Sequence, residues 1–545
     1  MKEVLDKGFA SKVFIISFLM LIFFSFGLKV DNLELGSPYV TIDDNTMYEA
    51  GFLVWFGQAP PQRTYLESWV AGLSSLSTYA YQALTSGEGL GVNLIADAYR
   101  DFYYNPAQYV YSYRVVMLCI DLITVLFVFL LARKLLGNSI KWVPYFVAAL
   151  YGLSYNTVWS NVVARPDTLT AFFSTLGLLL YYHSKFGVNK REFYLAALCF
   201  GVATGVKLHA AFFVIFIFID CLRLNGFSRK NLSLLPFGTI SVVSFLIAAG
   251  SPLFDPLTYI KLRLLNVKDD ASPWIEWGEQ FQVILEGTGW FTIPAILLFF
   301  MHFLLKKKCD KTSPVLSLLL IGICWLVLFS MIRQMRAYWM LPALPVFYIL
   351  LGYALSQIKF SVWRNISVLI FSSIFTVQTF SQHRELQEIN YSEVTEWINE
   401  NISQDEMFFV TGFDSFQLPL SPENIENRRA KLINKTLLAG RFESSFTYRY
   451  VQFWEERSAL MLLDMLGEPL DKGFNYFSYF STPQEEYKDV YSLETMNYIF
   501  VQEHSVLSGD SSFKELLSSQ FVFVDEMRGA GGGGTGLMYN VYRRQ

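Results

Sequence analysis

Long apolar runs fill the chain up to Phe380, and they constrain its fold more than any other feature. A run of about 20 apolar residues spans a bilayer as a helix, whereas one of roughly 10–14 residues need not. The chain has roughly eleven candidate runs, and this pattern predicts a polytopic α-helical membrane protein. The runs cover approximately Val13–Leu28, Val110–Leu131, Trp142–Tyr155, Leu169–Tyr182, Phe193–Val206, Ala210–Leu222, Leu234–Ala249, Trp290–Leu305, Val315–Ile332, Trp339–Leu355 and Val362–Phe380.

Two places leave alternatives open. The pair of short runs on either side of Lys207 forms either two crossings or one re-entrant hairpin, and both choices leave an odd number of crossings. The first run follows several lysines, but no small-x-small cleavage site comes after it. We therefore expect the first run to remain in the protein as a membrane anchor.

Lysines and arginines of short loops stay on the cytoplasmic side of a membrane, so their positions predict the orientation. They recur in every second loop, which places the amino terminus in the cytoplasm and residues 382–545 outside it. The basic residues are Lys2, Lys7 and Lys12; Arg133, Lys134 and Lys141; Lys185, Lys190 and Arg191; Arg223, Arg229 and Lys230; Lys306, Lys307, Lys308 and Lys311; and Lys359 and Arg364.

The composition excludes several classes of protein. The chain is 53% hydrophobic and 17% charged, against about 25% charged in soluble domains, so neither a disordered chain nor an ordinary soluble enzyme fits. The net charge is 43 − 47 = −4, which provides no global basic field for nucleic acid. The five cysteines form no CxxC pair, so neither a disulfide framework nor a zinc site is indicated.

Residues 382–545 differ from the rest and predict a soluble α/β domain. Their apolar runs shrink to the length of strands, and charged residues become frequent. The glycine-rich Gly529–Gly536 lacks the GK[ST] of a phosphate-binding loop, so a mobile turn is favoured over a nucleotide site. We expect a helix at Ser392–Asn401 and strands at Met407–Val410, Tyr498–Val501, Phe521–Val524 and Leu537–Tyr542.

Two acidic features lie in the loops that this orientation places outside. The adjacent carboxylates of Asp43 and Asp44 repel each other, which raises one pKa and suits a general base. The alternative is an Asx-rich turn or a cap of a helix over Met47–Phe56, and a cap can also position a catalytic carboxylate. In Arg165-Pro166-Asp167, the arginine and aspartate either reach the outer membrane face or serve as an interface anchor and a helix cap.

Two basic features face the same side. Lys207 and His209 lie where lipid headgroups begin, which favours a phosphate contact, although a snorkelling lysine is the plain alternative. A lone histidine such as His209 is seldom a metal ligand. Arg333 and Arg336 break the positive-inside pattern and share a helix face, and arginine suits phosphate oxygens. The alternative for these arginines is interface anchoring beside Tyr338 and Trp339.

In this order and on this side, the motifs resemble the GT-C superfamily of glycosyltransferases, which use polyprenyl-phosphate-linked sugars. The nearest patterns are those of protein O-mannosyltransferases and lipid A aminoarabinose transferases. The family's Asp-Glu-x-x-Tyr is similar to Asp44-Asn45-Thr46-Met47-Tyr48, with Asn45 in place of Glu. Further resemblances are Arg165-Pro166-Asp167, Gly201–Lys207, and Arg336-Ala337-Tyr338 followed by Leu341-Pro342 and Pro345, with Ala337 interrupting the usual Arg-Tyr.

The resemblance covers about the first 400 residues and implies a GT-C-like bundle of about 11 transmembrane helices. It implies a transmembrane catalytic module over residues 1–381, whose first outer loop, residues 31–109, carries juxtamembrane helices. Residues 382–545 form the extracytoplasmic soluble α/β domain. Tyr65–Leu84 suits a helix in the membrane interface, and a loop packed on the C-terminal domain is the alternative.

The resemblance also implies a function, which is transfer of a sugar from a polyprenyl-phosphate carrier to an acceptor hydroxyl outside the cytoplasm, with inversion. The acceptor is a lipid, a glycan or a protein, and the location is the bacterial inner membrane. Asp44 is the implied base, with Asp43 as a second acid, and Asp167 either orients the acceptor or supports the oxocarbenium-like charge. The implied phosphate ligands are Arg336, Lys207, Arg333 and Arg165, and the implied substrate contacts are Tyr48, His209 and Tyr338.

No cofactor is expected, and we favour a reaction without a metal over one with a hard cation held by these carboxylates. Two other classes remain as alternatives. A lipid-linked-sugar transporter or flippase would be equally polytopic, but the sequence shows no inverted internal repeat, and the apolar runs hold no acid except Asp121 and Asp220. An O-antigen polymerase or ligase also uses lipid-linked sugars, but it would lack the early Asp44 motif.

Overall fold

In the computed structural model, the chain divides into two compact units. The first consists of Met1–Leu33, Thr64–Glu67 and Arg114–Glu385, and the second of Glu34–Arg63, Ser68–Tyr113 and Leu386–Gln545. The structure describes residues 23–30, 33, 42–57, 65–87, 90–91, 93–136, 142–162, 166–184, 187–226, 229–250, 277–290, 292–297, 314–330, 337–358, 361–387, 393–411, 418, 421–422, 424–425, 473–478, 495–502, 511–529 and 537–545.

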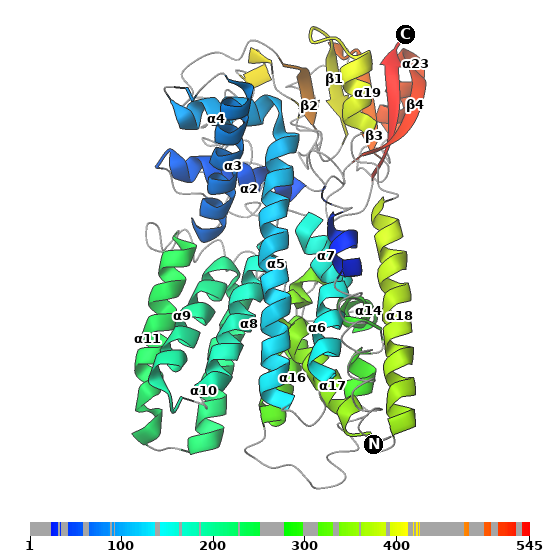
Figure 1. Cartoon of the computed structure of the whole chain (residues 1–545). Helices are drawn as coiled ribbons and strands as arrows, with labels where there is room; N and C mark the ends of the chain where they lie inside the picture. The colour runs from blue at the N-terminus through cyan, green and yellow to red at the C-terminus, as the bar shows by residue number, and fades with distance from the viewer. Residues whose placement is uncertain are drawn as a thin grey trace. The chain divides into compact units, whose positions relative to one another are not determined.

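The first unit is helical (Figure 1). Its described helices follow the predicted apolar runs closely, and the run Leu234–Ala249 coincides with α11. The α-helices of this unit include α5 (Pro106–Leu136), α6 (Val143–Leu153), α7 (Tyr155–Val162), α8 (Asp167–His183), α9 (Lys190–Val206), α10 (Ala211–Asn225), α11 (Leu234–Ala249), α14 (Trp277–Thr288), α16 (Pro314–Ser330), α17 (Leu344–Ser356) and α18 (Ser361–Gln387). The 3-10 turns are η1 (Leu208–Ala210), η2 (Arg229–Ser233) and η3 (Ala337–Ala343).

Four helical stretches of the described chain are long and apolar enough to cross a membrane, namely Pro106–Leu136, Leu208–Asn225, Asn231–Ala249 and Trp339–Ser356. The runs around Lys207 form the separate helices α9 and α10, of which α10 with η1 is long enough to cross. Much of the predicted runs Val13–Leu28 and Trp290–Leu305 lies outside the described residues. The count of about 11 crossings therefore stays a prediction.

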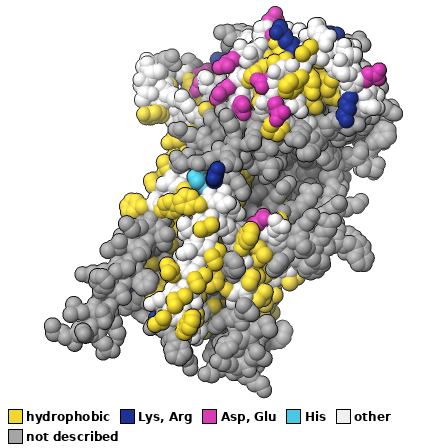
Figure 2. Space-filling model, turned by 90° about the vertical axis from the view of Figure 1, so that its right-hand side faces the viewer, with side chains coloured by type: hydrophobic (Ala, Val, Ile, Leu, Met, Phe, Trp, Pro, Cys, Tyr) yellow, Lys and Arg dark blue, Asp and Glu magenta, His cyan; other side chains and the backbone are white. Residues whose placement is uncertain are grey.

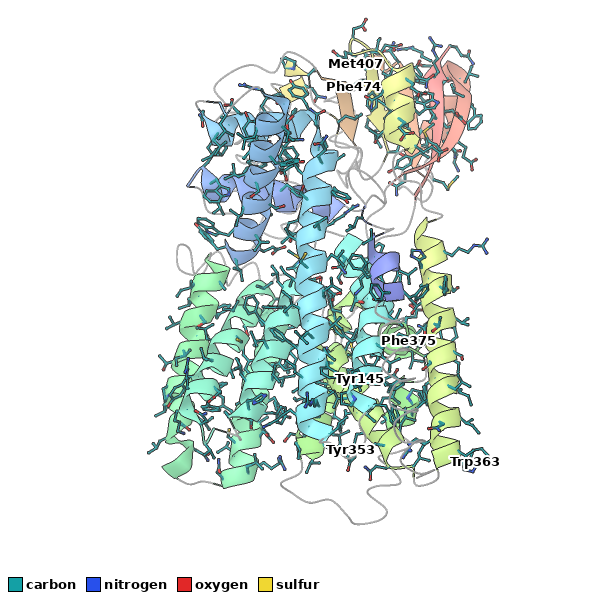
Figure 3. The ribbon with its side chains drawn as sticks, viewed as in Figure 1. Tyr145, Tyr353, Trp363, Phe375, Met407 and Phe474 are labelled. Carbon is teal, nitrogen blue, oxygen red and sulfur yellow. The ribbon has the colours of Figure 1, made fainter. Side chains whose placement is uncertain are left out.

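The surface of the helical unit suits a membrane. On the face in Figure 2, hydrophobic side chains dominate the described surface of this unit, whereas charged side chains gather over the second unit. Tyr353 of α17 and Trp363 of α18 lie at the same end of the helical unit (Figure 3), and Trp363 is exposed. Tyrosine and tryptophan favour the membrane–water interface, and the same end of α18 carries Arg364, which is predicted to be cytoplasmic.

Small residues let α9 and α11 pack closely, side by side in Figure 1. A Cβ atom added to Gly201 would lie 2.3 Å from the carbonyl oxygen of Ser241. One added to Gly205 would lie 2.6 Å from the Cβ atom of Ala248. The glycines of the Gly201–Lys207 motif therefore serve helix packing, as small residues commonly do between membrane helices.

The two acids found inside apolar runs are both paired. Lys29 donates to Asp121, and both side chains are almost fully buried. Asp220 accepts hydrogen bonds from Arg223, from Ser317 at 2.7 Å and from Tyr181 at 2.8 Å, which joins α10 to α16 and α8. Partners of this kind offset the cost of burying a carboxylate in a helical bundle.

Three helices of residues 31–109, the predicted first outer loop, belong to the second unit, together with the C-terminal residues. They are α2 (Ile42–Trp55), most of α3 (Tyr65–Ser86) and α4 (Leu94–Tyr104). Aromatic rings form their core, where Tyr48 stacks on Phe102 and meets Tyr113 edge to face. The only charged residue of α3, Glu67, is buried, whereas Trp69 and Leu73 are exposed. This is the inverse of the pattern of a soluble helix and suits the predicted interface helix.

The C-terminal part holds a five-stranded sheet in the order β2-β1-β3-β5-β4. β1 runs parallel to β2 and β3, whereas β5 is antiparallel to β3 and β4. All four predicted strands and the predicted helix are present, while β2 and α23 had not been predicted. The elements are α19 (Glu393–Asn401), β1 (Met407–Val410), β2 (Asn475–Ser478), β3 (Tyr498–Gln502), α23 (Ser511–Gln520), β4 (Phe521–Gly529) and β5 (Leu537–Arg544).

Candidate active site

The centre of the candidate site is an ion pair between Lys207 and Asp167. The Lys207 ammonium donates to Oδ1 of Asp167 at 2.6 Å. Asp167 is fully buried, and the Lys207 side chain is 17% exposed. The other carboxylate oxygen of Asp167, Oδ2, is buried and accepts no hydrogen bond from the described residues. Two motifs that lie 40 residues apart in the sequence therefore meet in one cluster.

The ends of two helices position this pair. Asp167 is the first residue of α8 and follows Pro166, whose fixed φ suits a helix start. A carboxylate at this end also interacts favourably with the helix dipole. Lys207 is the residue at which α9 ends, with an extended backbone, and η1 follows directly. Because α8 and α9 pack against each other, the two side chains can meet at the helix ends.

His209 lies beside the pair in the sequence, and its ring contacts a tryptophan. The rings of His209 and Trp325 meet edge to face, with their centroids 5.5 Å apart. Trp325 belongs to α16 and is almost fully buried. Sequence reasoning did not single out Trp325, because one tryptophan in an apolar run carries no signal of a site. The contact gives His209 a packing partner inside the helical unit.

The arginine motif approaches the same region through its backbone. Tyr338 lies in η3, which packs against α7 and against α8, the helix that begins at Asp167. Arg165, Arg333, Arg336 and the side chain of Tyr338 lie outside the part of the chain that the structure describes. The structure therefore brings the second and third motifs into contact and places part of the fourth on an adjacent element.

The first motif belongs to the second unit. Its helix α2 begins at Ile42, so Asp43 and Asp44 lie in the first helical turn and do not precede a helix that starts at Met47. The helix starts earlier than predicted because acids are also favourable inside a first turn, where they face the positive end of the dipole. Tyr48 is fully buried, and its hydroxyl lies 3.4 Å from the carbonyl oxygen of Val110, to which it donates.

In the part of the chain that the structure describes, no three His, Cys, Asp or Glu side chains are grouped so that they could hold a metal ion. The side chains of Asp43 and Asp44 lie outside the described part of the chain. A reaction without a metal therefore stays a prediction.

Neither a protein-family model nor a curated protein sequence matches the chain. Among solved structures, the chain is similar to ArnT from Cupriavidus metallidurans, with a TM-score of 0.48 and 10% identity over 97% of this chain and 98% of that one. It is also similar to the oligosaccharyltransferase of Archaeoglobus fulgidus, with a TM-score of 0.44 and 11% identity over 71% of this chain and 58% of that one. The arabinofuranosyltransferase AftD from Mycobacteria has a TM-score of 0.35 and 12% identity, over 94% of this chain and 40% of that one.

Two of these solved structures are sugar transferases by name, an oligosaccharyltransferase and an arabinofuranosyltransferase. At identities of this size no residue role passes from one chain to the other. The assignment of roles at the site therefore rests on the residues of this chain and their contacts.

The ion pair has a consequence for the chemistry of the site. The Lys207 ammonium carries three N–H donors, one of which bonds to Asp167, and an ammonium of this kind suits a phosphate oxygen. Asp167 in turn keeps one free acceptor oxygen, which suits a hydroxyl donor. The cluster can thus contact an anion and a hydroxyl group at adjacent atoms.

Proposed function

We propose that the chain is a membrane glycosyltransferase that moves a sugar from a polyprenyl-phosphate carrier to an acceptor hydroxyl on the extracytoplasmic side. The Lys207–Asp167 pair is the observation that carries the proposal, because it joins a cation and a buried carboxylate with a free oxygen. Its position at the ends of α8 and α9, in an apolar helical unit, suits a substrate whose phosphate lies at the membrane surface.

In the proposed reaction the acceptor oxygen attacks the anomeric carbon while the bond from that carbon to the phosphate oxygen breaks. The electron pair of that bond leaves with the polyprenyl phosphate. Lys207 and Arg336, with Arg333 and Arg165, stabilise the departing phosphate, and losing one such donor typically costs about 10²–10³ in rate. Asp167 orients the acceptor hydroxyl through its free oxygen.

Asp44 is the proposed general base, which takes the proton of the acceptor hydroxyl as the new bond forms. Attack on the face opposite the leaving phosphate inverts the anomeric centre. Asn45 stands where the GT-C motif usually has Glu, so Asp43 is the proposed second acid of this chain. Asp43 and Asp44 lie in the first turn of α2, so both residues have a helical backbone.

The direct test is Asp44→Asn in the purified full chain. The assay follows release of undecaprenyl phosphate from undecaprenyl-phosphate-linked sugars, offered one at a time with a membrane lipid extract as the source of acceptor. We expect the wild type to turn over one of these donors and Asp44→Asn to lose at least 10²-fold in rate while still binding undecaprenyl phosphate. Near wild-type turnover by the variant would show that Asp44 is not the base.

A second substitution tests the phosphate side. Arg336→Ala is expected to weaken binding of undecaprenyl phosphate at least tenfold, because a charged donor to the phosphate is lost. Arg191→Ala, at the predicted cytoplasmic start of α9, is the matched control and should bind as the wild type does. Equal binding by both variants would remove Arg336 from the proposed phosphate site.

Neither alternative class gains support from a specific observation. A transporter that relays protons needs acids whose charge can change, and Asp121 and Asp220 are both held in buried ion pairs. The early acidic motif, which an O-antigen polymerase or ligase would lack, forms the start of α2. These observations therefore favour the glycosyltransferase.

A further inference from the structure

The second unit contains a pocket that none of the predicted site residues lines. Its volume is about 670 Å³, within the range of roughly 300–1,000 Å³ of small-molecule sites. One side is formed by the end of α4 and the start of α5, with Tyr103, Tyr104 and Gln108. The other side is formed by α19 and the residues that follow it, with Asn399 and Gln404. Phe474, labelled in Figure 3 next to β1, also lines the pocket.

Amide side chains give the pocket its polar character. Asn105, Gln108, Asn399 and Gln404 each offer both hydrogen-bond donors and acceptors, and all four are exposed to solvent. Such groups match hydroxyls, which also donate and accept. Tyr103 and Tyr104 add flat apolar surface beside these amides. Their rings meet edge to face, with the centroids 5.7 Å apart. Amides next to aromatic rings suit a ligand with many hydroxyls and an apolar face.

The charge of the residues that line the pocket indicates which class of ligand it can bind. Asp101 is the one charged residue among the described residues that line the pocket. Its carboxylate is already occupied, because Asn105 donates to Oδ1 at 3.1 Å and the Tyr109 hydroxyl donates to Oδ2 at 2.5 Å. With no described lysine or arginine in the lining, an anionic ligand would lose its hydration without gaining a counter-charge. The lining therefore favours a neutral ligand.

We propose that this pocket binds a neutral glycan. The hydroxyls of the sugar units would bond to the amides, and the apolar face of one unit would pack on an aromatic ring. The assignment of this glycan as part of the acceptor rests on the proposed function, whereas the binding itself does not. The acceptor class that follows is a molecule with an uncharged sugar portion.

The test uses the purified full chain on an array of neutral and anionic oligosaccharides. The double variant Asn399→Ala with Gln404→Ala removes two amides that are exposed, so the fold is retained. The matched control is Asn401→Ala, on the same helix, whose side chain donates to the carbonyl oxygen of Trp397 and does not line the pocket. We expect the wild type and the control to retain neutral oligosaccharides and the double variant to lose at least tenfold in affinity.

Three results would overturn the proposal, namely no retention of any neutral oligosaccharide by the wild type, a preference for anionic ones, or equal binding by the double variant. The variant Asp44→Asn separates this inference from the proposed function, because it should bind the array as the wild type does. If Asp44→Asn also keeps full transferase activity, the proposed base is wrong while the glycan pocket stands. If transfer depends on Asp44 but the protein binds no neutral oligosaccharide on the array, the glycan pocket is wrong while the proposed function stands.

Discussion

Lys207 donates to the buried carboxylate of Asp167 at 2.6 Å and so joins the end of α9 to the start of α8. Replacing one partner of such a pair leaves the other charge buried and uncompensated, which costs about 3–5 kcal/mol. We expect Lys207→Met to lower the free energy of unfolding by about 3 kcal/mol, the lower end of this range, because Lys207 is partly exposed. Thermal unfolding in detergent, followed by tryptophan fluorescence, measures the loss.

The double variant Lys207→Met with Asp167→Asn is the control for this prediction. It removes both charges, so stability should return most of the way to that of the wild type. Transfer should not return, because the ammonium that contacts the phosphate and the carboxylate that orients the acceptor are both gone. A double variant that is stable and fully active would make the pair purely structural.

Gly201 permits the close contact between α9 and α11. A Cβ atom at this position would lie 2.3 Å from the Ser241 carbonyl oxygen, so Gly201→Ala is expected to cost about 1–3 kcal/mol through overpacking. Gly27→Ala is the matched control, because its Cβ atom would meet nothing within 4 Å. In the helix that contains Gly27, the same glycine-to-alanine change should be neutral or stabilise the protein by up to about 1 kcal/mol. Equal melting temperatures of the two variants would contradict the packing role of Gly201.

Leu73 tests whether the exposed face of α3 meets lipid. The side chain is 59% exposed on a helix whose one charged residue is buried. With benzoylphenylalanine in place of Leu73, illumination in phospholipid nanodiscs should crosslink the protein to lipid. The same probe at Ser518, an exposed position of α23, should crosslink far less. Crosslinks from position 73 into residues 386–545 would instead support a loop packed on the C-terminal domain.

Local patterns predicted the elements well. The run Leu234–Ala249 matches α11, and Met407–Val410 matches β1, because run length and residue type determine these elements within a single segment. β2 was missed because its sequence, Asn-Tyr-Phe-Ser, begins and ends with polar residues, whereas β1 is apolar throughout. The early start of α2 was missed because Asp43 and Asp44 suit both a turn and a first helical turn.

The site was predictable only in part. The residue types and their predicted outer position indicated Asp167 and Lys207 separately, from loops where charge is scarce. Their contact could not be predicted, because it depends on how α8 packs against α9 across 40 residues. The pairing of Asp121 with Lys29 was missed for the same reason, since Lys29 reads as an ordinary residue at the end of the first apolar run.

The pair between Lys29 and Asp121 gives the last prediction, because neither side chain is more than 1% exposed. Asp121→Asn leaves the ammonium without a counter-charge in the helical unit and is expected to cost about 3–5 kcal/mol. Arg100→Met is the matched control, since it removes a solvent-exposed pair with Asp97 and should cost less than about 1 kcal/mol. Thermal unfolding of both variants measures the difference. If Asp121→Asn is as stable as the wild type but loses transport of a lipid-linked sugar into vesicles, the aspartate is a relay of a transporter and the structural role is wrong.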